Sequence, residues 1–152
     1  MEKEKTIDVL NTLITINNDR IEGYETASKE TNEQDLKNLF AQFTRTSLKC
    51  KHELVNEANK LGGTATEGTK ITGKFFRVWM DVKAALTGNN RQLILDSCEY
   101  GESKAVDTYE NVLKNDSEHL SAAQQRMISI QLESIKADHE TVRSMHEELI
   151  VD

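Results

Sequence analysis

The stretch LILDSCEYGESKAVDTYENVL, residues 93–113, has the apolar spacing of an amphipathic helix. Its apolar residues recur at intervals of three and four, which places them along one helical face. They are Ile94, Leu95, Cys98, Ala105, Tyr109, Val112 and Leu113. Glu102 falls in the middle of this face. A carboxylate directed at the bundle core is either a ligand or catalytic group, or a buried acid that satisfies neighbouring polar groups. The stretch therefore predicts a bundle helix with a polar centre.

Three other segments repeat this plan. Apolar residues at helical spacing predict one helix from about Lys5 to Ser28, and a second that begins near a capping-box spacing of Thr31 and Gln34 and stops at Gly62-Gly63. A third helix spans about residues 89–114, with Asn89 or Asn90 as its N-cap, and a fourth follows the turn at residues 114–119. Short links between long helices make two antiparallel hairpins, residues 5–61 and 89–150.

The hairpins are joined by residues 62–88, a segment that contains five of the seven glycines. Within it Phe75, Trp79, Val82 and Leu86 have the spacing of a short amphipathic helix. A connection this long can return along the length of a bundle, whereas an up-down-up-down bundle needs only a short loop. The sequence therefore predicts an all-α fold in one domain over residues 1–152: a ferritin-like four-helix bundle with a long crossover.

Composition narrows the class of protein further. Proline is absent and aromatic residues make up 5% of the chain, which favours long helices over sheets. A net charge of −7 disfavours nucleic acid and anionic membranes as partners. The chain has no apolar run long enough to span a membrane and no secretory signal at its start, and its two cysteines fit a reducing compartment. We therefore expect a cytoplasmic protein.

Several motifs are similar to those of a known family. They are INNDRIEGYETAS, the LGG after the second helix, GKFFRVWMDVKAAL, CEYGES and KADHETVR. With them the chain resembles, over nearly its whole length, an uncharacterised bacterial family of ferritin-like four-helix-bundle proteins, a domain of unknown function. The resemblance implies the bundle and supports the crossover. It implies no activity, substrate or cofactor.

The ligand set of ferritin-like di-metal sites is missing from this sequence. Such sites need an inward Glu-x-x-His on two helices, because residues i and i+3 project from one face. None of the four histidines has Glu three residues before it. The nearest match, Asp116-x-x-His119, lies in the turn predicted between the third and fourth helices. This absence argues against a ferritin or ferroxidase.

A polar layer remains at the predicted bundle centre, and it allows two interpretations. In one, Glu102, Asp138, His139 and Glu25 hold a single divalent metal, for which carboxylate and imidazole suit iron, manganese or zinc. In the other, Glu102 hydrogen-bonds with Tyr24, Gln131 or Arg20 and fixes the helix register. We favour the second, because so irregular a ligand set often arises without a metal.

The function expected from the sequence is binding rather than turnover. The sequence identifies no catalytic or cofactor-binding residues, and the cofactor is unknown, with a divalent metal (iron, manganese or zinc) as the candidate. We expect a homo-oligomer or a protein that binds a protein partner. Two other classes stay open: a metal-dependent enzyme of the oxidase type that uses Glu102, Asp138 and His139, and a metal-binding protein without turnover. Cys50 and Cys98 are interpreted as small buried apolar residues.

Overall fold

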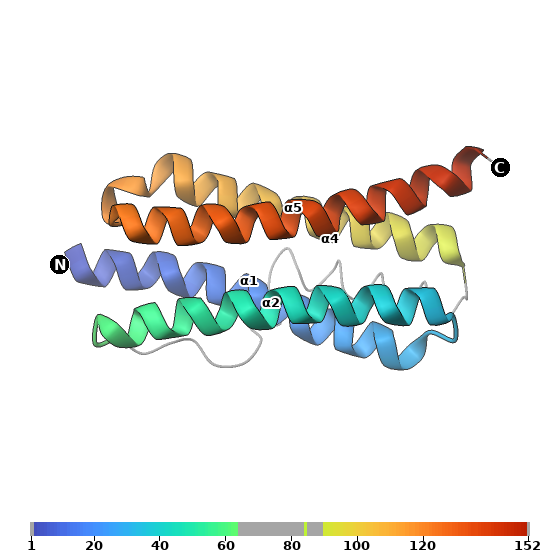
Figure 1. Cartoon of the computed structure of the whole chain (residues 1–152), viewed down its shortest axis with the longest axis horizontal. Helices are drawn as coiled ribbons and strands as arrows, with labels where there is room; N and C mark the ends of the chain where they lie inside the picture. Colours follow the sequence, from blue (N-terminus) through green and yellow to red (C-terminus); the bar gives the residue numbers. More distant parts are fainter. Residues whose placement is uncertain (1, 64–83, 85–89, 152) are drawn as a thin grey trace.

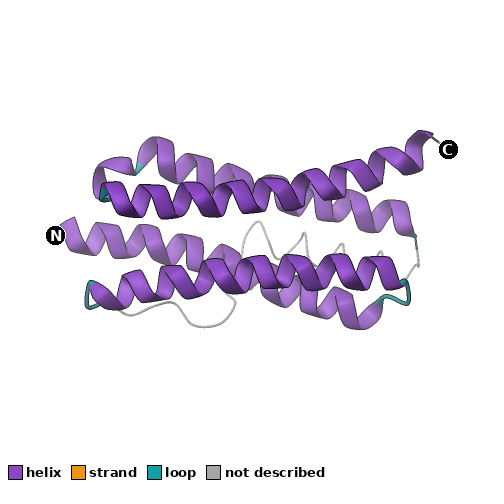
Figure 2. Cartoon of the chain, in the orientation of Figure 1, coloured by secondary structure: helices purple, strands orange, loops and turns teal. Residues whose placement is uncertain are grey.

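A computed structural model describes residues 2–63, 84 and 90–151 of the chain. The described residues form four long α-helices (Figure 2). No described residue lies in a β-strand. With the labels of Figure 1, they are α1 (Glu2–Glu30), α2 (Gln34–Lys60), α4 (Arg91–Asn115) and α5 (Ala122–Val151). A 3₁₀ turn, η1 (Ser117–His119), separates α4 from α5. The all-helical fold predicted from the sequence is confirmed.

The helices pair as two antiparallel hairpins, α1 with α2 and α4 with α5 (Figure 1). At one end of the molecule Arg91, the first residue of α4, forms ion pairs of 2.9 and 2.6 Å with Glu33 and Asp35 at the start of α2. At the other end His119 lies 3.0 Å from Glu2 at the start of α1. Helices α2 and α4 therefore begin at the same end of the molecule and run in the same direction.

The core consists of two apolar clusters along the length of the bundle. One holds residues from the first half of α1, the second half of α2, the second half of α4 and the first half of α5, among them Leu10, Leu13, Ile14, Leu54 and Tyr109. The other holds residues from the opposite halves of the same helices, among them Tyr24, Phe40, Phe43, Ile94 and Leu95. Each cluster is the inward face of four amphipathic helices, so burial of this face stabilises the helices that form it.

The end of α2 shows why the sequence stops the helix at two glycines. Gly62 has a φ of +77°, a left-handed conformation in which a Cβ atom is strained. The N–H of Gly62 donates to the carbonyl of Asn59 at 2.9 Å, and the N–H of Gly63 donates to the carbonyl of Ala58 at 3.0 Å. This pair of bonds is the Schellman motif, and it satisfies carbonyls that the helix leaves unpaired.

The starts of the helices differ in how well the sequence predicts them. Asn90 caps α4 as expected, because its side chain accepts a hydrogen bond from the N–H of Leu93. The capping box expected at Thr31 and Gln34 is wrong. Glu33 occupies the N-cap of α2 and makes no side-chain cap bond, while the Thr31 hydroxyl accepts from the N–H of Glu33 instead.

Some expectations from the sequence fall on residues that the structure does not describe. The short helix expected over Phe75, Trp79, Val82 and Leu86 lies outside the described residues, as does Asn89. No helix among the described residues is both long enough and apolar enough to cross a membrane.

Replacement of Gly62 by alanine is expected to lower the free energy of unfolding by about 1–2 kcal/mol, because a Cβ atom disfavours positive φ. Gly62→Asn should cost less, since asparagine tolerates this conformation better. Urea unfolding followed by circular dichroism measures both. Asn59→Ala, at an exposed position one turn earlier, serves as the control and should change stability little. Equal losses for all three variants would contradict the assignment.

Candidate functional site

The polar centre of the bundle is built around Arg20, whose side chain is 1% exposed. Its Nε donates to Glu102 Oε2 at 2.8 Å, and its Nη2 donates to Glu102 Oε1 at 2.6 Å. The other terminal nitrogen, Nη1, donates to the Ser47 hydroxyl at 2.7 Å. Nη2 also reaches Asp138 Oδ2 at 3.2 Å. One guanidinium on α1 therefore contacts α2, α4 and α5 at once.

The remaining contacts complete the shell of this charge. The second oxygen of Asp138 accepts from the Gln42 amide at 3.3 Å, so both of its oxygens have partners. The centre of the Arg20 guanidinium lies 5.6 Å from the Tyr24 ring centroid and 6.0 Å from that of Phe43. Aromatic faces attract cations at such distances. The guanidinium is thus surrounded by carboxylates, a hydroxyl and two rings.

Burial and charge act in opposite directions on the two members of the central ion pair. Burial is the largest influence and disfavours the charged form of Arg20, but the charge and hydrogen bond of Glu102, together with the charges of Tyr24 and Asp138, outweigh it, so the pKa of Arg20 is raised. Burial raises the pKa of Glu102 above its ordinary value, opposed by the charge and hydrogen bonds of Arg20. Each ion therefore depends on the other to remain charged in the core.

A second polar layer lies beside the first and again joins all four helices. The Tyr109 hydroxyl accepts from the Asn17 amide at 2.9 Å and donates to Gln131 Oε1 at 2.7 Å. The Gln131 amide then donates to Glu53 at 3.0 Å and to the carbonyl of Cys50 at 3.3 Å. Each of the donors just named has an acceptor, although Asn17 Oδ1 has no partner among the described residues. The layer therefore satisfies most of its polar groups, which would otherwise be costly to bury.

Local sequence explains why the two layers form at adjacent levels of the bundle. Asn17, Arg20 and Tyr24 are separated by three and four residues, so they project from one face of α1. Glu102 and Tyr109 are separated by seven residues on α4, as are Gln131 and Asp138 on α5. Because seven residues span about two helical turns, α4 and α5 each contribute one residue to each layer.

Of the four residues predicted to bind a metal, the structure brings two together. Glu102 and Asp138 both contact Arg20 and are buried. Glu25 is exposed on α1, five residues beyond Arg20, and His139 is half-buried beside Asp138. Within residues 2–63 and 90–151, no group of three His, Cys, Asp or Glu side chains is placed to hold a metal ion.

The contacts of Glu102 do not suit a ligand of a divalent metal ion. Both oxygens of Glu102 accept from Arg20, and a guanidinium beside a metal ion would place two positive charges together. The alternative prediction, in which Glu102 bonds to Arg20, is confirmed. The metal site of Glu25, Glu102, Asp138 and His139 stays a prediction, and these contacts do not support it.

Both cysteines lie within the described core, as the sequence indicated, and both thiols are free. Burial raises the pKa of Cys50 to about 11 and raises the pKa of Cys98 further. Since the thiolate is the reactive form of cysteine, burial keeps both residues in their unreactive form near neutral pH.

Asp19 is a buried acid that the sequence did not single out. It is 4% exposed, and its Oδ1 has no hydrogen-bond partner in the part of the chain that the structure describes. Asp19 directly precedes Arg20 in the sequence, so its side chain points about 100° away from that of Arg20 around α1. Burial, with a smaller effect from the charge of Glu22, raises the pKa of Asp19 to about 7.

Replacement of Arg20 by methionine is expected to lower the free energy of unfolding by about 3–5 kcal/mol, because Glu102 loses its cation while buried. The double variant Arg20→Met/Glu102→Leu should be less destabilised than the sum of the two single variants. Urea unfolding of all three gives the coupling energy. Arg143→Met, at an exposed arginine of α5 that also contacts acids, is the control and should be nearly neutral. Additive losses at Arg20 and Glu102 would contradict the central role of this pair.

Asp19→Asn is expected to change how stability depends on pH. The pKa of Asp19 is about 7 in the folded chain, against 3.8 for an unperturbed group. The folded state therefore keeps a proton that the unfolded state has lost, and stability falls as pH rises between these values. The variant should gain on the order of 1–3 kcal/mol at about pH 8 and little at about pH 4. Denaturant unfolding across this range measures the gain. Asp8→Asn, at an exposed position on α1, is the control and should show the same dependence of unfolding free energy on pH as the unchanged protein. An equal gain for Asp19→Asn at both pH values would disprove the assignment.

Helices α1, α2 and α4 also carry the part of the chain that is similar to a known family. The model of a family described as Domain of unknown function (DUF2383) matches residues 5–115. The matched segment includes Arg20, Ser47 and Glu102 but ends before α5, which supplies Asp138. No curated protein matches the sequence. Since the match covers more than half of the chain, the protein belongs to the family of the Domain of unknown function (DUF2383).

Proposed function

We propose that this protein is a non-enzymatic, ferritin-like helical bundle that acts through self-association or through binding of a protein partner. The observation that carries the proposal is the state of the buried charges. Hydrogen bonds pair the charged groups of Arg20, Glu102 and Asp138 with one another and with Ser47 and Gln42. A centre of this kind holds helices together, so the outer faces of the bundle are left to carry the function.

The ferritin-like topology is part of the same proposal. Residues 62–88 would form a crossover that returns along the length of the bundle. Support comes from Arg91, which pairs with Glu33 and Asp35 and so holds the start of α4 beside the start of α2. The end of α2 lies at the opposite end of the molecule (Figure 1). These two positions support the proposed crossover.

A cytoplasmic location is proposed on the basis of the thiols. Cys50 and Cys98 are both free and buried. Free cysteines persist in reducing compartments, whereas oxidising compartments favour disulfides.

The proposal is tested by measuring mass and metal content on the same preparation, purified without chelator or affinity tag. We expect the mass in analytical ultracentrifugation to rise above the 17.2 kDa of one chain as concentration increases. We expect metal well below one equivalent, and no rise in Tm on titration with Fe(II), Mn(II) or Zn(II).

Two variants separate the proposal from its rival, a metal-binding or metal-dependent oxidase-type protein. His139→Ala removes a residue of the predicted metal site, and His52→Ala removes an exposed histidine of α2 as a control. Near-stoichiometric metal that is lost in His139→Ala and kept in His52→Ala would establish the metal site. A chain that stays monomeric at every concentration would overturn self-association.

A further inference from the structure

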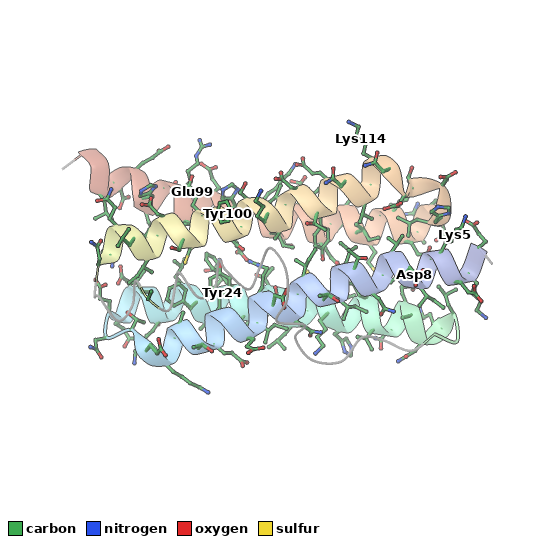
Figure 3. The ribbon with its side chains drawn as sticks, turned by 180° about the vertical axis from the view of Figure 1, so that it is seen from behind. Lys5, Asp8, Tyr24, Glu99, Tyr100 and Lys114 are labelled. Atoms are coloured by element: carbon green, nitrogen blue, oxygen red, sulfur yellow. The ribbon has the colours of Figure 1, made fainter. Side chains whose placement is uncertain are left out.

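Among the described residues, two of the four exposed large apolar side chains share one stripe of α4. Leu93 and Tyr100 are 51% and 53% exposed, whereas Leu48 and Ile130 lie on α2 and α5. Leu93 and Tyr100 are seven residues apart, so they lie within about 20° of each other around the helix. Tyr100 is two residues from the buried Glu102 and therefore lies on nearly the opposite side of α4. Figure 3 labels Tyr100 on this helix.

Opposite charges flank Tyr100 at equal distances along α4. Asp96 precedes it by four residues and is exposed, and Lys104 follows it by four residues and is half-buried. The Nζ of Lys104 lies 5.2 Å from the Tyr100 ring centroid, so this charge is close to the stripe. Asp96 Oδ1 lies 2.5 Å from Nε2 of His146 on α5, which holds Asp96 in place. The stripe thus has an apolar centre with a negative side chain before it and a positive one after it.

We propose that this stripe of α4 is an interface with a second copy of the chain, packed antiparallel about a two-fold axis at Tyr100. A two-fold axis at this residue brings position 100 + n of one helix to the level of position 100 − n of the other. Lys104 then lies level with Asp96 of the partner subunit, and the same pair forms twice. Tyr100 of each copy supplies the apolar contact between these pairs, and Leu93 lies outside them, level with Asp107 of the partner subunit.

Charge selects this arrangement over the parallel one. In a parallel pair Lys104 would face Lys104 of the partner subunit, and Asp96 would face Asp96 of the partner subunit. Like charges held opposite each other are repulsive, and such repulsion is a common source of specificity between helices. The inference rests on the proposed self-association and names the surface that performs it.

Charge reversal tests the interface in the full-length chain. Lys104→Glu and Asp96→Lys should each weaken self-association by about tenfold or more, because two attractive pairs become two repulsive ones. The double variant Lys104→Glu/Asp96→Lys restores both pairs and should associate as the unchanged protein does. An equimolar mixture of the two single variants should form mixed dimers, which native mass spectrometry detects by mass.

A second pair of variants tests the apolar part of the stripe. Tyr100→Glu should give a monomer, while Ile130→Glu, at an exposed isoleucine of α5, should leave the association constant unchanged. Both positions are exposed, so circular dichroism should show both variants folded. Association that survives Tyr100→Glu but is lost in Ile130→Glu would overturn the α4 interface and leave the proposed function standing. Failure of the double charge variant to recover would also overturn it. A monomeric unchanged protein would overturn both the interface and self-association, and would leave partner binding as the proposed function.

Discussion

The arrangement of the four helices depends on one buried cation. A guanidinium removed from water is costly unless its donors find acceptors and its charge finds a counter-charge. Arg20 meets these needs with Glu102, Ser47 and Asp138, which belong to three different helices. Because the guanidinium is planar and its donors are fixed in direction, a helix that slides along its neighbours loses these bonds. The polar layer therefore sets the register that apolar packing alone leaves free.

The second layer strengthens this constraint at an adjacent level. Asn17, Tyr109 and Gln131 form a chain of hydrogen bonds from α1 through α4 to α5, and Gln131 continues it to α2. Polar contacts also tie the two ends of the bundle, at Arg91 and at His119. These end contacts are partly exposed and contribute less than the buried layers. The centre thus dominates the specificity of packing, and the apolar clusters on either side supply most of the stabilisation.

The same burial that builds the core lowers its reactivity. The pKa values of Cys98, Tyr24 and Tyr109 are raised, chiefly because burial disfavours their charged forms. Groups held in their neutral forms make poor nucleophiles and poor metal ligands. The proposed function therefore rests on the outer faces of the bundle, such as the stripe of α4 that carries Leu93 and Tyr100.

The sequence by itself determined the local features of this protein. Apolar spacing predicted the four described helices, glycine predicted the end of α2, and Asn90 was predicted as a cap of α4, because each depends on residues close together in the chain. The inward direction of Glu102 and Asp138 followed from the same periodicity. The failed capping box at Thr31 shows the limit of spacing alone, since the turn before α2 decides which residue becomes the cap.

Only the tertiary structure decided what the polar centre is. Arg20 lies on the same face as Asn17 and Tyr24, a signal present in the sequence, but a long basic side chain at such a position can equally reach water. Its burial depends on Glu102 and Asp138, which are 82 and 118 residues away along the chain. Glu25 and His139 lay at the edges of their predicted faces, where a small rotation of the helix decides between core and surface. Helical periodicity places a residue on a face, whereas the partner that it meets there depends on how the helices pack.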